Sequence, residues 1–186
     1  MPFPADPARS TQYQAQLINN DKVDYRNLSP VLRMLDIMYT HGEGDQADAD
    51  GQGEIQLIAL PVEGMEIKIW PHMCLLAHSQ FAAASTMSIG LREYYTFEGV
   101  QVPEDPDFFF LNVDTAAAAL DDTLWTGVTG VQVDNTPIPI QIAGPGLDGV
   151  YRTSEESMLR IFATIAGGNI EIGDTINLRM AVGYGA

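Results

Sequence analysis

Cysteine is almost absent from this chain of 186 residues, since Cys74 is the single example. One cysteine excludes an internal disulfide framework, so packing and, in an assembly, association with neighbours must stabilise the fold. Cys74 lies in the apolar run Met73–Leu76. We therefore expect it to be a small buried hydrophobe of the core.

Basic residues are also scarce, with nine Lys and Arg against 25 Asp and Glu, which gives a net charge of −16. Such a charge repels phosphate backbones and anionic lipid headgroups over roughly a Debye length, so we expect neither nucleic acid nor a membrane as a partner. Two interpretations of the acidic excess stay open. It serves solubility, or it marks the outward face of an assembly.

Long apolar runs and targeting signals are missing as well. The chain has no run of about 18 apolar residues, which a membrane-spanning helix would need. Residues 1–6 carry neither the basic region nor the apolar core of a signal peptide. We therefore expect a soluble chain that is not exported through such a signal.

Patterns of catalytic residues are equally sparse. No serine lies in a Gly-x-Ser-x-Gly turn, and the glycines near residues 42–53 do not follow a strand-to-helix turn that would bind phosphate. His72 and His78 would share a face if they lay on one strand, but no third metal ligand follows. The His-x-His pair of cupins is also absent. We therefore expect no enzyme activity, no metal and no cofactor.

Two stretches leave a binding role open. The acids between Asp45 and Gly51 resemble the ligands of a hard cation, although an EF-hand would need an acid at Gln46 and a glutamate at Leu57. A looser calcium site and a solvated acidic loop both stay open, and the solvated loop is preferred. Five of the aromatic residues form either a sugar-stacking platform or part of the core. They are Trp70, Tyr94, Tyr95, Phe97 and Trp125.

The chain is rich in alternating apolar and polar residues, the pattern of half-buried strands. Thr175–Val182 is the clearest case, with apolar residues at every second position. The turn at Leu60–Gly64 predicts that the strands on its two sides form a hairpin. The segment 32–39 fits a helical turn or a strand, and a strand is favoured. Further strands are predicted at 55–59, 65–69, 75–81, 86–91, 107–113, 131–133, 138–142 and 159–165.

Short strands separated by Gly, Pro and Asp turns predict an all-β fold, a jelly-roll-like antiparallel β-sandwich over residues 32–186. Residues 1–31 have prolines and no sustained apolar face, so we expect an extended N-terminal arm that orders against a partner. The sequence Ala116–Leu120 predicts one short helix, capped by Asp114 or Thr115. Residues 94–106 are expected to be a long connection across one end of the sheet.

Four patches within residues 32–186 share a common likeness. They are Gly53–Ile67, Ala84–Leu91, Pro106–Phe110 and Asn169–Leu178. In this order they resemble the small jelly-roll decoration, or cement, proteins of tailed bacteriophage heads. The resemblance implies a protein that binds the outside of a capsid, commonly as a trimer at three-fold positions, and clamps the shell against the pressure of packaged DNA. It implies no catalytic residues, and it covers neither the arm nor residues 94–106.

These observations lead to one hypothesis: a virion structural protein on the outer surface of the capsid, a homotrimer that contacts the major capsid protein. The arm and one end of the sandwich would make that contact, and prolines at 137 and 139 place the strand 138–142 at a sheet edge or bulge. A receptor- or carbohydrate-binding module of a phage tail or fibre is the alternative, and a cupin-like enzyme is the second alternative. The candidate partner-binding residues are Phe3, Tyr13, Leu17, Tyr25, Ile138 and Ile140.

Overall fold

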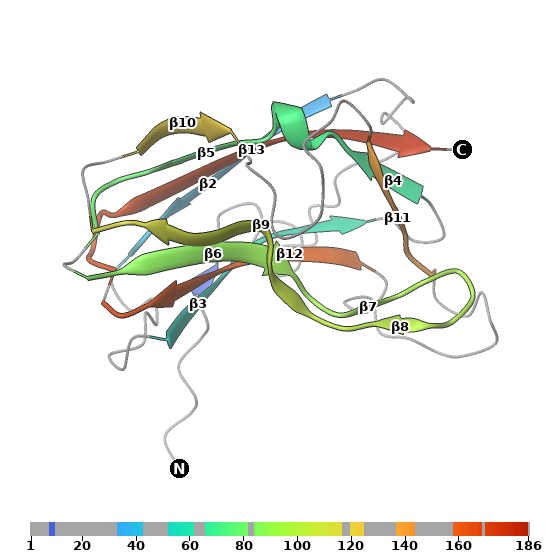
Figure 1. Ribbon diagram of the computed structural model, residues 1–186, viewed down its shortest axis with the longest axis horizontal. Helices are drawn as coiled ribbons and strands as arrows, with labels where there is room; N and C mark the ends of the chain where they lie inside the picture. The colour runs from blue at the N-terminus through green and yellow to red at the C-terminus, as the bar shows by residue number, and fades with distance from the viewer. Residues whose placement is uncertain are drawn as a thin grey trace, which may run out of the picture.

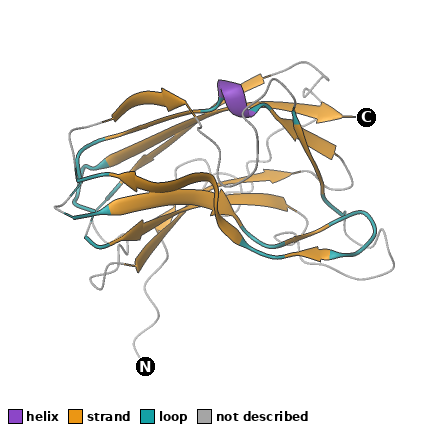
Figure 2. Ribbon diagram, in the orientation of Figure 1, coloured by secondary structure: helices purple, strands orange, loops and turns teal. Residues whose placement is uncertain are grey.

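The computed structural model describes residues 8–9, 33–42, 52–61, 66–81, 84–116, 120–124, 137–143, 158–168 and 170–185. Within these residues the chain consists almost entirely of strands, as predicted, with one 3-10 turn, η2, at Pro71–Met73 (Figure 2). No helix in this part of the chain is long and apolar enough to cross a membrane. The strands are β1 (Ala8–Arg9), β2 (Arg33–Thr40), β3 (Gln52–Pro61), β4 (Glu66–Ile69), β5 (Leu75–His78), β6 (Thr86–Leu91), β7 (Tyr94–Tyr95), β8 (Gln101–Val102), β9 (Asp105–Asp114), β10 (Leu120–Leu124), β11 (Ile138–Gln141), β12 (Met158–Ala166) and β13 (Thr175–Gly185).

Two sheets face each other as the layers of a sandwich (Figure 1). One sheet has the order β1-β3-β12-β6-β9, and the other has the order β10-β5-β13-β4-β11 with β2 also paired to β13. β5 pairs with residues 176–179 of β13, and β4 pairs with residues 182–185. β4 and β5 are therefore two successive halves of one strand, interrupted by η2.

β10 and β11 are related in the same way, because β10 pairs with β5 and β11 pairs with β4. We count each of these two pairs as one strand, leave out the separate β7–β8 ribbon, and number the remaining strands from β2 to β13. The orders of the two sheets are then 2-7-4-5 and 1-8-3-6. This is the strand order of a double-sheet jelly roll. The predicted fold class is confirmed.

The core lies between the two sheets. On β13 the side chains of Ile176, Leu178, Met180 and Val182 are fully buried, as the alternation predicts. Facing side chains come from β3, β6 and β12 of the other sheet, among them Ile55, Leu57, Met87, Ile89, Leu159 and Ile161.

The single cysteine belongs to this core. Cys74 is fully buried, and its thiol donates a hydrogen bond to the carbonyl oxygen of Trp70 at 3.3 Å. Burial raises the pKa of the thiol to about 11, so it stays protonated at neutral pH. The expectation of a small buried hydrophobe is confirmed.

The hairpin predicted around Leu60–Gly64 is wrong. β3 pairs with β1 and β12, whereas β4 pairs with β11 and β13 in the opposite sheet. The chain between β3 and β4 therefore passes from one layer of the sandwich to the other. Alternation could not distinguish the two cases, because a strand buries one face in either arrangement.

The short helix predicted at Ala116–Leu120 is wrong at its C-terminal end, because Leu120 begins β10; residues 117–119 lie outside the described residues, so the rest of this prediction stays untested. Asp114 Oδ1 accepts a hydrogen bond from the backbone N–H of Ala116 at 3.0 Å, which is the contact that an N-cap residue makes. At Leu120 the chain instead pairs with His78 of β5. The segment 32–39, in contrast, forms β2 as favoured.

Candidate functional site

Residues 94–106, predicted to be a long connection, contain a short β-ribbon formed by β7 and β8 at one end of the sandwich (Figure 1). Its turn is closed by hydrogen bonds from the N–H of Thr96 to the carbonyl of Val100 and from the N–H of Gly99 to the carbonyl of Thr96. The N–H of Ala143 donates to the carbonyl of Tyr95 at 2.8 Å. The ribbon is thereby attached to the chain that follows β11.

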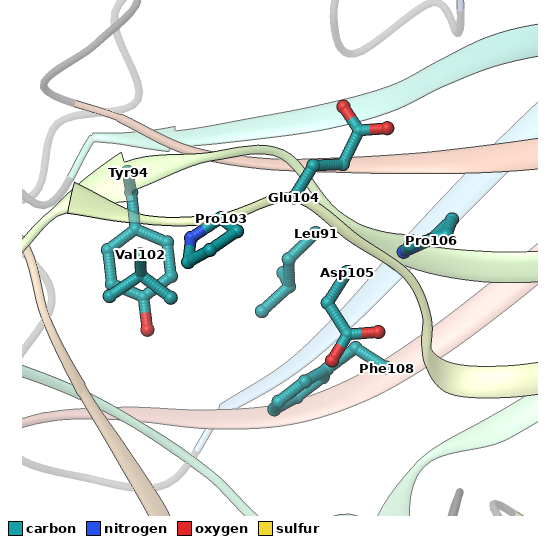
Figure 3. Close-up of a pocket in the computed structure, with 8 residues that line it drawn as sticks. All are labelled: Leu91, Tyr94, Val102, Pro103, Glu104, Asp105, Pro106 and Phe108. Carbon is teal, nitrogen blue, oxygen red and sulfur yellow. The ribbon is translucent and has the colours of Figure 1, made fainter.

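A pocket of about 310 Å³ opens where this ribbon meets the ends of β6 and β9 (Figure 3). Its volume is at the lower end of the roughly 300–1,000 Å³ typical of ligand sites. The walls are mostly apolar, with Leu91 buried and Tyr94 and Phe108 half-buried, while Asp105 is exposed. Its lining residues are Leu91, Tyr94, Val102, Pro103, Glu104, Asp105, Pro106 and Phe108.

A close approach of β9 to β6 shapes the pocket. A Cβ atom at Gly90 would lie 2.0 Å from the carbonyl oxygen of Asp105 and 2.3 Å from the carbonyl carbon of Pro106, so only glycine fits. Ile89 pairs with Phe110 and Leu91 with Asp105, so two steps along β6 span five along β9. This bulge frees the residues of β9 that line the pocket.

Ion pairs around Arg92 hold the chain at the rim. The guanidinium pairs with Glu54 of β3 and with Glu104, and it lies 4.5 Å from the centre of the Phe162 ring on β12. The side chain of Arg92 is 23% exposed, so each ion pair contributes at most about 1 kcal/mol to stability. Together they connect the pocket rim to two neighbouring strands.

Two of the titratable groups that line the pocket, Tyr94 and Asp105, have shifted pKa values. Burial raises the pKa of the Tyr94 hydroxyl. Desolvation raises the pKa of the Asp105 carboxyl, and the side chain of Asp107 raises it further by hydrogen bonding and by charge repulsion. A hydrogen bond from the Asp107 backbone N–H to Asp105 acts in the opposite direction but is weaker. A cation placed beside Asp105 would stabilise its ionised form.

The opposite end of the sandwich is closed by buried hydrogen bonds. Thr115 and Ser85 are fully buried, and Thr115 Oγ1 donates to Ser85 Oγ at 2.8 Å. Ser79 Oγ donates to Asp174 Oδ1 at 2.9 Å and accepts from the N–H of Thr175 at 2.9 Å. These hydrogen bonds of Ser79 and Ser85 connect the turns between strands.

The histidines do not form the arrangement that the sequence allowed. His72 lies in η2 and His78 in β5, so the two do not share a strand. His78 is buried with Nδ1 2.6 Å from the carbonyl oxygen of Ser79, and His41 is buried with Nδ1 2.8 Å from the Tyr39 hydroxyl. Among the described residues, no group of three His, Cys, Asp or Glu side chains could hold a metal ion.

The candidate edge strand is β11, which does lie at the edge of its sheet beside β4. The side chain of Ile140 is buried in the core and that of Ile138 packs against the core, while Pro139 and Gln141 are exposed. A partner at this edge would therefore meet the backbone and the two exposed residues. The isoleucine side chains face inward.

Several predicted features lie outside the described residues, so their predictions stay untested. They are Phe3, Tyr13, Leu17 and Tyr25 of the arm, the acidic segment 45–51, the strand 131–133 and Trp125.

Of the aromatic residues considered for a sugar platform that the structure describes, only Tyr94 lines the pocket. The ring of Trp70 packs instead on Gly183 of β13, since a Cβ there would lie 2.9 Å from the ring. Sequence reasoning missed Leu91, Asp105 and Phe108. A glycine inside the strand pattern, Gly90, was the available signal, because such a glycine often marks a bulge or a close backbone approach.

Comparisons of the chain with protein-family models, with curated proteins and with solved structures found no match, so the fold and the pocket carry the functional proposal.

Proposed function

We propose that this chain is a virion structural protein, a decoration protein that binds the outer surface of a tailed-phage head and stabilises the shell. Its jelly-roll sandwich supports the proposal, because the patches that resemble decoration proteins fall on framework strands. The patches reach β3, β6 and β9 of one sheet and β13 of the other.

The observation that carries the proposal is the pairing of β1 with the edge of β3. Ala8 and Arg9 lie beside Ile55 and Gln56 in parallel orientation, so this part of the arm runs along a sheet edge. An extended segment that joins a sheet through its backbone can join a partner's sheet in the same way. In the proposed assembly the arm, residues 1–31, reaches the major capsid protein.

The mechanism is one of added contact area. Each copy bridges neighbouring shell subunits through the arm and one end of the sandwich, and a homotrimer multiplies these contacts. Many weak contacts held together bind far more tightly than any one of them alone. The acidic surplus, a net charge of −16, faces solvent.

The test is binding of the purified protein to isolated heads that lack it. We expect stoichiometric co-sedimentation with heads, and a particle mass in solution of three times 20.3 kDa by light scattering. A monomer that does not sediment with heads would overturn the proposal. A few copies located at the tail would instead favour a receptor- or carbohydrate-binding module, the alternative that the pocket beside Tyr94 supports.

Removal of residues 2–28 tests the role of the arm. We expect a folded trimer that no longer co-sediments with heads, because β3 keeps its pairing with β12 when β1 is lost. Circular dichroism and light scattering check the fold and the trimer. A control replaces Phe3, Tyr13, Leu17 and Tyr25 by alanine at full length. Unfolding of the truncated chain would show that the arm belongs to the core, and undiminished head binding would exclude it as the contact.

A further inference from the structure

The pocket beside the β7–β8 ribbon combines three features that point to one ligand chemistry. Leu91 and the rings of Tyr94 and Phe108 give it apolar and aromatic walls. The carboxylate of Asp105 lies on the Phe108 side of the pocket, whereas Glu104 points away (Figure 3). Because Glu104 is paired with Arg92, Asp105 is the carboxylate that a ligand in the pocket would meet.

We propose that this pocket binds the side chain of a lysine or an arginine from a partner protein. The methylene stem packs against Leu91, Tyr94 and Phe108, and the charged group meets the carboxylate of Asp105. Long basic side chains bury their stems on apolar surface in this way while the charge stays at the rim. The aromatic rings add an attraction for the cation.

The size of the pocket and the charge of the chain favour this ligand over others. A volume of about 310 Å³ accommodates one side chain and leaves little room for an extended chain of sugars. The net charge of −16 attracts a basic segment before contact is made. A guanidinium or ammonium group also compensates the desolvation and the Asp107 repulsion that raise the pKa of Asp105.

This inference is independent of head decoration, because it concerns the chain and a short basic peptide alone. Titration of the ¹⁵N-labelled full chain with acetyl-Gly-Arg-Gly-amide, followed by amide NMR shifts, tests it directly. We expect shifts clustered at Leu91, Tyr94, Val102 and Phe108, with the same cluster for the lysine peptide. The peptide with citrulline, which has the shape of arginine without its charge, is expected to bind about tenfold more weakly.

Two variants separate the pocket from the overall charge. Asp105→Asn is expected to weaken the arginine peptide about tenfold. Glu171→Gln removes one charge on the turn before β13 and is expected to leave the affinity unchanged. β13 begins at the end of the sandwich opposite the β7–β8 ribbon (Figure 1). Since Asp105 is exposed, we expect the Asp105→Asn variant to fold. The amide spectrum of the variant checks this.

Three outcomes would overturn the proposal. They are equal affinity for the arginine and citrulline peptides, equal affinity of the Asp105→Asn variant and the unmodified chain, and shifts of the pocket amides by methyl glycosides with none by the basic peptides. The last outcome would assign the pocket to carbohydrate.

Discussion

The two ends of the sandwich are built on opposite principles. At the end near Thr175, Ser79 hydrogen-bonds with Asp174 and Thr115 hydrogen-bonds with Ser85, and both Ser85 and Thr115 are fully buried. At the other end, charged groups remain partly exposed around a pocket, and a strand is bulged to make room for it. The first arrangement stabilises the fold, whereas the second leaves surface available for binding.

The sharpest way to break the pocket end is to add a side chain at Gly90. Gly90→Ala places a Cβ against the backbone of Asp105, so β9 must move away, and we expect a loss of about 3 kcal/mol in unfolding free energy. Chemical denaturation measures the loss.

Gly173→Ala at the other end is the matched control for this change. Gly173 has φ +94°, but no atom lies within 4 Å of the position that an added methyl group would take, so only backbone strain of about 1 kcal/mol is expected. A smaller loss for Gly90→Ala than for Gly173→Ala would contradict the close approach of β9 to β6.

At the hydrogen-bonded end, Thr115→Val keeps the shape of the side chain and removes the hydroxyl that donates to Ser85. We expect a loss of about 1–2 kcal/mol, because the interaction is buried. Thr96→Val on the β7–β8 ribbon removes a hydroxyl that accepts an exposed hydrogen bond from Val100, and it should cost a few tenths of that. Equal losses in thermal unfolding would remove the contrast between the two ends.

The smallest expected effect is on the pH dependence of stability. Because the folded pKa of Asp105 lies above its unfolded value, ionisation of this carboxyl disfavours the folded state. At pH values above the folded pKa of Asp105, Asp105→Asn should therefore raise the melting temperature slightly. The gain should vanish at pH values below the unfolded pKa near 4. A gain that is the same at pH 3 and pH 7 would show that it does not come from this titration.

The sequence was sufficient for most of the long strands but not for their partners, and it did not predict β7, β8 or β10. Alternation predicted β6, β12 and β13, because a half-buried strand needs one apolar face whatever lies beside it. Alternation did not predict the partners of β3 and β4, because a hairpin and a passage between the two layers would bury the same residues. The helix prediction failed at Leu120, which begins β10 and pairs with His78 of β5, because that pairing depends on a strand distant in the sequence.

The pocket lay beyond sequence reasoning for a similar reason. Tyr94 was noticed as an aromatic residue, but its neighbours come from β9, which a bulge shifts against β6. Neither the bulge nor the pairing of Glu104 with Arg92 follows from local pattern, since both depend on which strands are adjacent. Only the glycine at position 90 carried a local trace of this geometry.

The interruption of the β4–β5 strand by η2 restricts the register in which β13 can pair with the two half-strands. The N–H groups of Met73 and Cys74 donate to the carbonyl oxygens of Trp70 and Pro71, so the turn forms hydrogen bonds within itself. The strand is therefore interrupted at a fixed position. A one-residue shift of register against β13 would have to move β4, η2 and β5 together, and it would turn the apolar side chains of both half-strands outward. We therefore expect η2 to favour a single register between β13 and the two half-strands when the chain folds.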